Sequence, residues 1–229
     1  MKKFLTVILL ALSLTVMPCG AMDIPNSPQR KATHEIIFPV IVPSETPGQP
    51  PELHHGLCTS SAIGPHALLT ATHCDVGETT LSVDRETGNR HVLGRVADGQ
   101  DHTILFVDGP AFQDTMGKLY DPDSYHMDKE GDDVFMFGDG GGMYPPQYRK
   151  GYRMDSVVFE PGEVDERMPA NSTVYLFDMP IVGGDSGSAI YDRHGKLVTL
   201  VTYGIEDGKY CGAYAMAFTE AQIKLARKF

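Results

Sequence analysis

Segments with the composition of β-strands occupy almost the whole chain, and only its last residues have the pattern of an α-helix. Apolar and β-branched residues alternate or run together in short stretches, such as 36–42, 103–109 and 132–142, and turns rich in glycine and proline separate them. In the segment TEAQIKLARKF, Thr219 and Gln222 have the spacing of a helix-capping box. The sequence therefore predicts an all-β fold followed by a C-terminal helix.

The strand pattern stops in the middle of the chain, where a polar stretch contains scattered glycines and prolines. Such a stretch is typical of a boundary between two units. We expect a first β unit over residues 22–118 and a second over 119–229, which includes the terminal helix. A chain of about 200 residues is long enough to bury a substantial core in such a fold.

The first 21 residues have the pattern of a secretory signal peptide. Two lysines precede the apolar run Phe4–Met17, and Cys19-Gly20-Ala21 offers small residues for cleavage. The run is shorter than the roughly 20 residues of a membrane-spanning helix. We expect cleavage after Ala21 and a secreted or periplasmic protein without stable membrane association. The alternative is an uncleaved N-terminal anchor.

The charge of the chain limits its expected partners, and its cysteine content agrees with an exported protein. Lys and Arg number 19 against 30 Asp and Glu, which gives a net charge of −11. Nucleic acid is not an expected partner, because phosphates are bound through cationic side chains. Without the leader, Cys58, Cys74 and Cys211 remain. A bridge closing the segment between Cys58 and Cys74 would contribute about 3 kcal/mol, which leaves Cys211 as a buried thiol or an intermolecular partner.

The candidate nucleophile is a serine surrounded by glycines in GGDSGSAI, residues 183–190. Those glycines permit either a tight turn or a nucleophile whose neighbouring N–H groups face a substrate oxygen. Ser186 needs a base, and histidine titrates near working pH. Of nine histidines, His73 differs because it closes the apolar segment ALLTAT and precedes Cys74. The alternative is an ordinary hydrogen-bonded histidine at a strand end.

These motifs resemble those of the chymotrypsin- and trypsin-like serine proteases. LLTATHC is similar to the histidine motif of that family, GQDHTILFVDG to its aspartate motif, and GGDSGSAI to its nucleophile motif. The resemblance covers roughly residues 56–229, though 110–170 only loosely. It implies two six-stranded antiparallel β-barrels and a Cys58–Cys74 disulfide. It also implies a triad of His73, Asp101 and Ser186, in the order that the family uses.

The resemblance assigns a role to each residue of this site. His73 would take the proton of Ser186 as its oxygen attacks a peptide carbonyl, and Asp101 would orient the imidazole. The backbone N–H groups of Gly184 and Ser186 would form an oxyanion hole.

Two strands after the nucleophile resemble those that bind the substrate. KLVTLVTYG is similar to the strand along the cleft, and CGAYAMAF to the strand that closes the specificity pocket. The implied substrate-binding residues are Pro180, Thr202, Tyr203, Gly204 and Gly212. Pro180 stands where the trypsin type carries an acid, so we expect a neutral, apolar preference instead of Arg or Lys.

Three other acids bear on this assignment. Asp98 and Asp108 flank the same strand as Asp101, and each acid could instead be a solvated loop charge. In activated members of the family, an Ile- or Val-led N-terminus pairs with the aspartate that corresponds to Asp185. No matching Ile-Val-Gly-Gly segment exists here. We expect Asp185 to have another partner, or the protein to need no activation by cleavage.

The sequence thus predicts a secreted, monomeric serine endopeptidase that acts on proteins or peptides through an acyl-enzyme, without metal or cofactor. The alternative is a catalytically silent relative that binds proteins in the same cleft. A metal site around His54, His55, His66 or Cys211 is weakly supported, because their spacing is not that of a zinc site. An esterase of another fold is also disfavoured, because no G-x-S-x-G surrounds Ser186.

Overall fold

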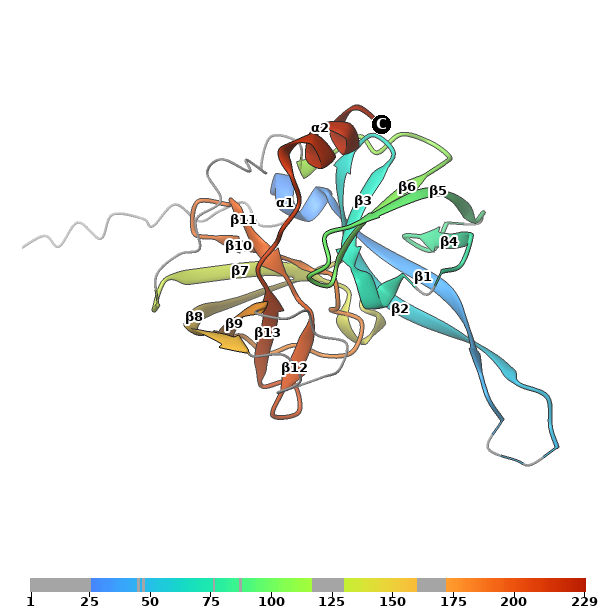
Figure 1. The fold of residues 1–229 in the computed structure, drawn as a ribbon, viewed down its shortest axis with the longest axis horizontal. Coiled ribbons are helices and arrows are strands. Elements are labelled where there is room, and N and C mark those ends of the chain that lie inside the picture. The colour runs from blue at the N-terminus through green and yellow to red at the C-terminus, as the bar shows by residue number, and fades with distance from the viewer. Residues whose placement is uncertain are drawn as a thin grey trace, which may run out of the picture.

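The structure is a computed structural model that describes residues 26–44, 46, 48–75, 77–86, 88–116, 130–159 and 172–229. It contains two antiparallel β units side by side, and the C-terminal helix lies against the first (Figure 1). The predicted leader, 1–21, and the predicted boundary at 118 lie outside the described residues. No helix in the described part of the chain is long and apolar enough to cross a membrane.

The first unit is a closed six-stranded barrel with strand order β1-β2-β3-β6-β5-β4. Its strands are β1 (Thr33–Val42), β2 (Glu52–Gly64), β3 (Ala67–Ala71), β4 (Thr80–Val83), β5 (Arg90–Ala97) and β6 (His102–Val107). Every side chain of β3 and β6 is buried. Leu68 belongs to a cluster within the barrel, whereas Leu69 belongs to a cluster that also contains Phe137 of the second unit. Burial on both faces explains why these strands are almost continuously apolar.

The second unit is a seven-stranded sheet with strand order β11-β10-β7-β8-β9-β13-β12. Its strands are β7 (Asp133–Gly138), β8 (Gln147–Phe159), β9 (Ser172–Asp178), β10 (Ala189–Asp192), β11 (Leu197–Leu200), β12 (Tyr203–Ile205) and β13 (Tyr210–Tyr214). The all-β prediction is confirmed, although this unit is an open, curled sheet. Between the edge strands β11 and β12, the N–H groups of Val201 and Thr202 donate to Ser188 and Gly212 respectively. These two residues thus face different neighbours, and the sheet does not close here.

Two helices flank the strands, α1 (Pro28–Lys31) and α2 (Glu220–Lys228). The predicted capping box of α2 is confirmed: the Thr219 hydroxyl accepts the Gln222 N–H at 3.3 Å, and the Gln222 side chain accepts the Thr219 N–H at 2.7 Å. The helix lies so close to β2 that a Cβ atom at Gly64 would overlap the carbonyl oxygen of Ala226. Glycine is therefore required where the helix crosses the barrel.

Strands β1 and β2 continue beyond the barrel as a two-stranded ribbon (Figure 1, lower right). Strand β4 pairs with β1 only at Ile36 and Ile37, whereas β2 pairs with β1 as far as Val42. Pro39 therefore lies where β1 has one partner strand, which is a usual position for proline in a sheet. Strand β2 begins at Glu52, so the proline-rich segment that follows β1 is short.

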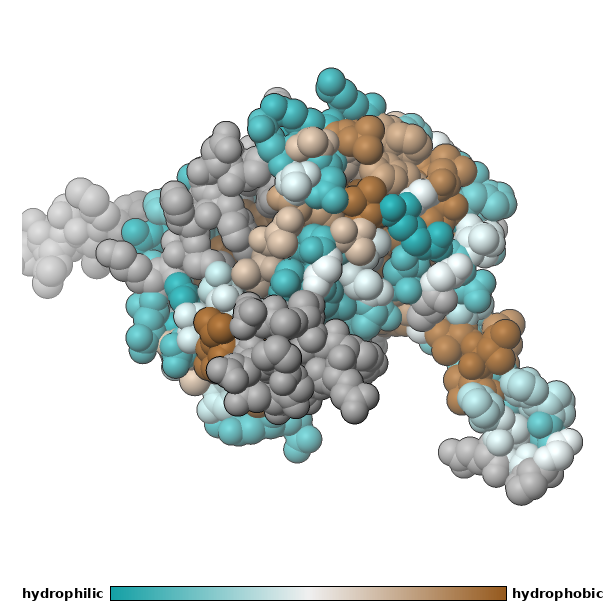
Figure 2. Space-filling model, viewed as in Figure 1, coloured by the Kyte–Doolittle hydropathy of each residue, from teal (hydrophilic) through white to brown (hydrophobic). Residues whose placement is uncertain are grey.

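The ribbon exposes apolar side chains. Ile41 and Leu53 lie opposite each other across its two strands and are 69% and 66% exposed. Figure 2 shows the corresponding apolar patch on the ribbon, outside the barrel. These side chains are thus separate from the buried clusters that stabilise the two units.

Candidate active site

His73 and Asp101 lie together at one end of the barrel. Strand β3 leads into the 3-10 turn η2 (Thr72–Cys74), and β6 begins directly after Asp101. The two strands are antiparallel, with Ala71 opposite His102, so the end of β3 meets the start of β6. His73 lies in the turn after the strand and not in the strand itself. That turn directs its side chain out of the barrel wall to an exposed position.

Two hydrogen bonds join this histidine to the aspartate. The backbone N–H of His73 donates to Asp101 Oδ1 at 2.9 Å, and His73 Nδ1 lies 2.9 Å from Asp101 Oδ2. The Asp101 carbonyl oxygen accepts the N–H of Thr72, also at 2.9 Å. Asp101 has φ +68°, a left-handed conformation that costs a non-glycine residue about 1 kcal/mol. These contacts hold the carboxylate against Nδ1, which favours a proton there and leaves Nε2 as an acceptor.

The other two acids beside strand β6 bind different histidines. Asp98 Oδ2 lies 2.7 Å from Nδ1 of His102, and both side chains are fully buried. Asp108 Oδ2 lies 2.8 Å from Nδ1 of His91, on the surface. Among the described residues neither acid contacts His73, so each of the three acids has a histidine of its own.

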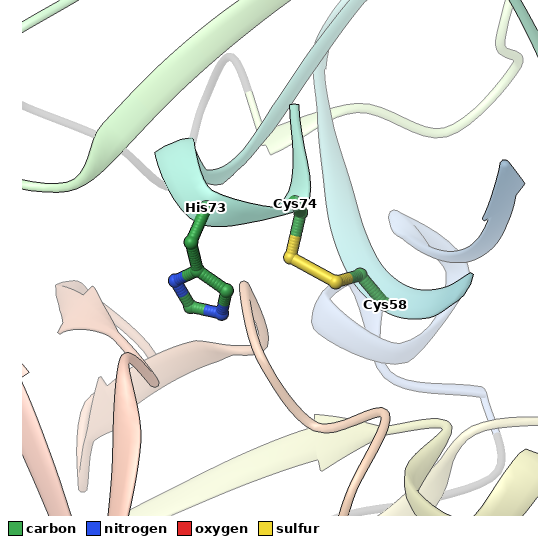
Figure 3. Close-up of side chains that lie close together, drawn as sticks. All are labelled: Cys58, His73 and Cys74. Carbon is green, nitrogen blue, oxygen red and sulfur yellow. A yellow bond between two sulfur atoms is a disulfide. The ribbon is translucent and has the colours of Figure 1, made fainter. Parts of the chain in front are cut away.

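The predicted disulfide joins Cys58 of β2 to Cys74 of η2, with Cα atoms 6.2 Å apart. Figure 3 shows the imidazole of His73 beside this bridge. The two sulfurs and the imidazole lie within 4.8 Å of one another, but sulfurs joined in a disulfide are not free thiolates and cannot act as thiolate ligands of a zinc ion. The bridge instead ties the turn that carries His73 to the neighbouring strand. Cys211 is a buried free thiol, and burial raises its pKa strongly.

The loop 183–186, called the nucleophile loop below, is bound to strand β2 through a single residue. Thr59 donates its N–H to the carbonyl oxygen of Ser186 at 2.9 Å. Its hydroxyl donates to the carbonyl oxygen of Gly184 at 2.8 Å. In both bonds a carbonyl oxygen of the loop accepts, so they fix the path of the loop backbone independently of its side chains.

Close packing brings the nucleophile loop to the turn that carries His73. Gly187 has φ +82°, and a Cβ atom there would overlap the carbonyl oxygen of Thr59 and the hydroxyl of Thr70. The carbonyl oxygen of Ser186 lies 3.8 Å from Sγ of Cys74, the residue after His73. Positions far apart in the sequence therefore meet across the contact between the two units.

The hydroxyl of Ser186 and two nearby amides have no hydrogen-bond partner among the described residues. In the described part of the chain, the hydroxyl makes no hydrogen bond, including to His73, and neither the Gly184 nor the Ser186 N–H donates one. Catalytic hydrogen bonds are often long before substrate binds. Gly184 has φ +99°, and a Cβ atom there would lie 2.9 Å from Leu57 Cδ2. Glycine thus meets both the backbone and the steric demands of this loop.

Asp185 is fully buried and receives contacts from several sides. Its Oδ1 accepts the N–H of Gly140 at 2.9 Å, and its Oδ2 accepts the N–H of Val182 at 2.8 Å. Arg149 of β8 forms an ion pair with Oδ2, without hydrogen-bond geometry. The partner that the sequence left open is thus a side chain of the protein. Arg149 lies in the region where the motifs matched only loosely, so the sequence offered no signal for it.

Tyr203, Gly204 and Gly212 lie together on the edge hairpin of the second unit. Tyr203 of β12 is opposite Gly212 of β13, and a Cβ atom at Gly212 would lie 2.5 Å from the tyrosine ring. Burial raises the pKa of Tyr203 to about 12, so its phenol is neutral at working pH. At Gly204, an added Cβ would lie 3.6 Å from Ile181 Cδ1. The predicted pocket is therefore bordered by uncharged groups, and part of its space is occupied.

The other two predicted substrate-binding residues differ in exposure. Thr202 is buried, and its hydroxyl has no hydrogen-bond partner among the described residues. Pro180 is exposed. Neither carries a charge, so these positions provide no counter-ion for a basic substrate side chain.

A buried acid that was not predicted from the sequence lies beside the nucleophile loop. Asp139 is fully buried, and neither carboxyl oxygen has a hydrogen-bond partner among the described residues. Burial raises its pKa to about 8, and the carboxylates of Glu35, Asp84 and Asp185 act in the same direction. The sequence feature that could have indicated Asp139 is a single acid in the glycine-rich segment GDGGG, immediately after an apolar strand.

Known proteins share this arrangement of strands. The family described as Trypsin matches residues 33–222. An inactive form of the protease Rv3671c from M. tuberculosis, in which a serine is replaced by alanine, has a TM-score of 0.62 at 16% identity and covers 82% of each chain. The active form of Rv3671c has a TM-score of 0.58 at 19% identity, over 87% of this chain and 81% of that one.

A further similar structure is that of the HtrA-type protease AlgW with a decapeptide. Its TM-score is 0.60 at 17% identity, and the match covers 87% of this chain and 63% of the AlgW chain. At such identities the likeness to solved structures concerns the fold. No curated protein matches the chain in sequence.

Proposed function

The chain belongs to the trypsin family of serine endopeptidases, and on this basis we propose that His73, Asp101 and Ser186 are its catalytic triad. The observation that carries the proposal is the pair of hydrogen bonds, each 2.9 Å, that holds Asp101 on the backbone and on Nδ1 of His73. Such a pair sets the tautomer that a general base needs. It lies beside a serine whose hydroxyl has no partner among the described residues.

The proposed reaction hydrolyses a peptide bond in two halves. Ser186 Oγ attacks the carbonyl carbon, and its proton passes to Nε2 of His73. The imidazolium then gives that proton to the amine nitrogen as the C–N bond breaks, which leaves an acyl ester on the serine. Water repeats the attack on this ester with His73 again as base. The carboxylic acid product leaves, and the serine hydroxyl is restored.

We assign the oxyanion hole to the backbone N–H groups of Gly184 and Ser186. Neither N–H is used by another described residue. Each such donor contributes about 3 kcal/mol to transition-state stabilisation in enzymes of this kind. The bonds from Thr59 to the carbonyl groups of the same loop support the role, because they orient the loop before a substrate arrives.

The proposed substrate is a protein or peptide with a small, neutral side chain at the cleaved residue. Uncharged groups border Gly204 and Gly212, and the Tyr203 ring and Ile181 take up space there. A buried anion would be needed to hold Arg or Lys, and the predicted position for it holds Pro180. A peptide library would show cleavage after Ala, Ser or Val. A profile dominated by charged residues would contradict this preference.

The proposed function includes export of the protein from the cytoplasm. We propose that residues 1–21 are removed and that the protein works as a monomer in the periplasm or outside the cell. The disulfide supports this assignment, because such bridges persist in oxidising compartments. N-terminal sequencing of the mature protein should begin at Met22. A mature protein that keeps Met1 would contradict removal of the leader.

A fluorophosphonate probe tests the triad directly. It should add once to the protein of residues 22–229, as read from intact mass, and should not add to Ser186→Ala or His73→Ala. Ser156→Ala, at an exposed serine of β8, is the matched control and should react like the parent. No adduct on the folded parent would contradict the proposal and favour a silent binding protein.

A further inference from the structure

Asp139 differs from the other buried acids of the described residues because its carboxyl group makes no hydrogen bond. It follows β7 and precedes the turn η5 (Gly140–Gly142), and it is 0% exposed. Neither of its carboxyl oxygens has a hydrogen-bond partner among the described residues. An anion so placed loses its hydration without compensation, so the neutral acid is the favoured form. In agreement, burial raises the pKa of Asp139 to about 8.

The charged groups that face Asp139 are mostly acidic. They come from three elements: Glu35 from β1, Asp84 and Arg85 from the turn after β4, and Asp185 from the nucleophile loop. The phenol of Tyr144, which follows η5, also interacts with Asp139. Repulsion from three carboxylates opposes ionisation of a fourth.

The single cation among these groups is already engaged. Arg85 Nε and Nη2 donate to the two carboxylate oxygens of Glu35, at 2.8 and 3.1 Å. Its Nη2 also donates to the carbonyl oxygen of Gly142 at 2.6 Å, and so holds the end of η5. Farther out, Arg149 is paired with Asp185, and His34 with Asp84. An ionised Asp139 would therefore have to draw Arg85 away from Glu35 and Gly142.

The backbone of the same short segment supports the nucleophile loop. The Gly140 N–H donates to the carboxylate of Asp185 at 2.9 Å, and the Gly141 N–H donates to the carbonyl oxygen of Gly183 at 2.7 Å. The Asp139 N–H donates to Thr59 Oγ1 at 3.0 Å. That hydroxyl in turn donates to the Gly184 carbonyl. A shift of this segment would therefore reach the loop through three separate hydrogen bonds.

We propose that Asp139 is a positioning residue: its neutral carboxyl keeps the segment 139–142 under the nucleophile loop, and its ionisation displaces that support and lowers turnover in alkaline solution. The inference rests on the proposed catalytic role of Ser186. Ionisation adds a fourth negative charge to the group. The Asp139 carboxylate and the Gly142 carbonyl oxygen then compete for the Arg85 guanidinium. The displaced loop would hold the oxyanion amides away from the reacting carbonyl, so kcat changes and KM does not.

The test is the pH profile of peptide-ester hydrolysis between pH 6 and 10. The parent should lose kcat above pH 8, to about a tenth by pH 9 for a single ionisation, while KM stays constant. Asp139→Asn imitates the neutral acid and should keep its kcat across this range. Asp114→Asn, at an exposed acid outside the group, is the matched control and should keep the alkaline loss.

A second variant tests the electrostatic origin of the effect and does not depend on the folding of Asp139→Asn. Glu35→Gln removes one repelling charge and frees Arg85 for Asp139, so ionisation becomes easier. The alkaline loss of kcat should then move to lower pH, which a purely structural role of Asp139 would not cause. An unchanged midpoint in Glu35→Gln would overturn the inference. Retention of the alkaline loss in Asp139→Asn would do the same.

Two controls separate this inference from its premises. Loss of the near-ultraviolet circular dichroism of the parent between pH 8 and 9 would overturn it, because activity would then be lost through unfolding. A fluorophosphonate adduct at pH 7 combined with constant kcat up to pH 9.5 would overturn the role of Asp139 alone. Absence of the adduct at pH 7 would instead defeat the proposed catalytic function.

Discussion

The guanidinium of Arg149 and the carboxylate of Asp185 form an ion pair between β8 and the residue before Ser186. The acid is fully buried, and the N–H groups of Gly140 and Val182 donate to it as well. Each of these three partners of Asp185 lies among the described residues. The residue before Ser186 is therefore supported by groups from within the protein.

Removal of this cation should weaken the fold. Arg149→Met leaves Asp185 as a buried carboxylate without its counter-ion, which costs about 3 kcal/mol of unfolding free energy. Urea unfolding at pH 7 measures this loss. Lys150→Met is the matched control, because Lys150 pairs with Asp133 at the surface and such pairs contribute less than about 1 kcal/mol. Equal losses in the two variants would contradict the importance of the Arg149 pair.

The orienting carboxylate should matter for catalysis and not for the fold. Asp101→Asn should lower kcat by about 10⁴, as amidation does in the well-studied triad of another protease, because the imidazole takes the wrong tautomer. Hydrolysis of a peptide ester measures the change. Asp108→Asn removes the same type of acid from the exposed pair with His91 and should leave kcat within about twofold. A comparable loss in Asp108→Asn would argue against Asp101 as the orienting residue.

Substitution of two glycines with similar backbone angles distinguishes the cost of backbone strain from the cost of steric overlap. Gly187 (φ +82°) and Gly99 (φ +80°) both have left-handed conformations, but an added Cβ at Gly99 has no neighbour within 4 Å. Gly99→Ala should cost about 1 kcal/mol through backbone strain alone. Gly187→Ala should cost about 3 kcal/mol or more, because its Cβ overlaps the backbone of Thr59. Guanidinium unfolding compares the two, and equal costs would contradict the close packing at Gly187.

The buried pair of Asp98 and His102 should make stability depend on pH. Burial favours the neutral form of Asp98, but hydrogen bonds from His102, Ala217 and Gln100 outweigh it, and the pKa of Asp98 lies below its ordinary value. The pair therefore contributes stability above pH 4, and the contribution is lost as the pH falls through the lowered pKa. Asp98→Asn should cost about 2 kcal/mol at pH 7.

The expected cost of Asp98→Asn shrinks towards pH 2, where the parent acid is itself protonated. Unfolding free energies measured with urea between pH 2 and pH 7 follow this change. Asp133→Asn, at an exposed acid paired with Lys150, serves as the control and should show a small effect at every pH. A cost of Asp98→Asn that stays constant over the whole range would contradict the lowered pKa.

The sequence was most informative where a short segment contains its own evidence. The capping box of α2 involves Thr219 and Gln222, one turn apart, and both halves are present. His73 followed by Cys74, and Ser186 among glycines, likewise place rare combinations within a few residues. Such local patterns carried the family resemblance and the fold class. They needed no knowledge of which strands are neighbours.

The sequences of three strands lack a strong apolar pattern and therefore do not indicate strands by themselves. Strand β4 has only four residues, and β5 and β8 contain several charged side chains. Pairing with neighbours stabilises these strands more than their own composition does. The contacts of Arg149 and Asp139 with the nucleophile loop likewise join segments far apart in the chain. A single sequence therefore gave no measure of either contact.

The nucleophile loop is held largely by main-chain groups and by the places where glycine leaves room. Gly140, Gly141 and Thr59 offer it backbone N–H groups, and the loop accepts two of these three through its carbonyl oxygens. Every residue except proline supplies the same backbone N–H and C=O groups. Substitution of a neighbouring side chain therefore leaves these main-chain hydrogen bonds in place. The shape of the loop depends instead on the positions where only glycine fits.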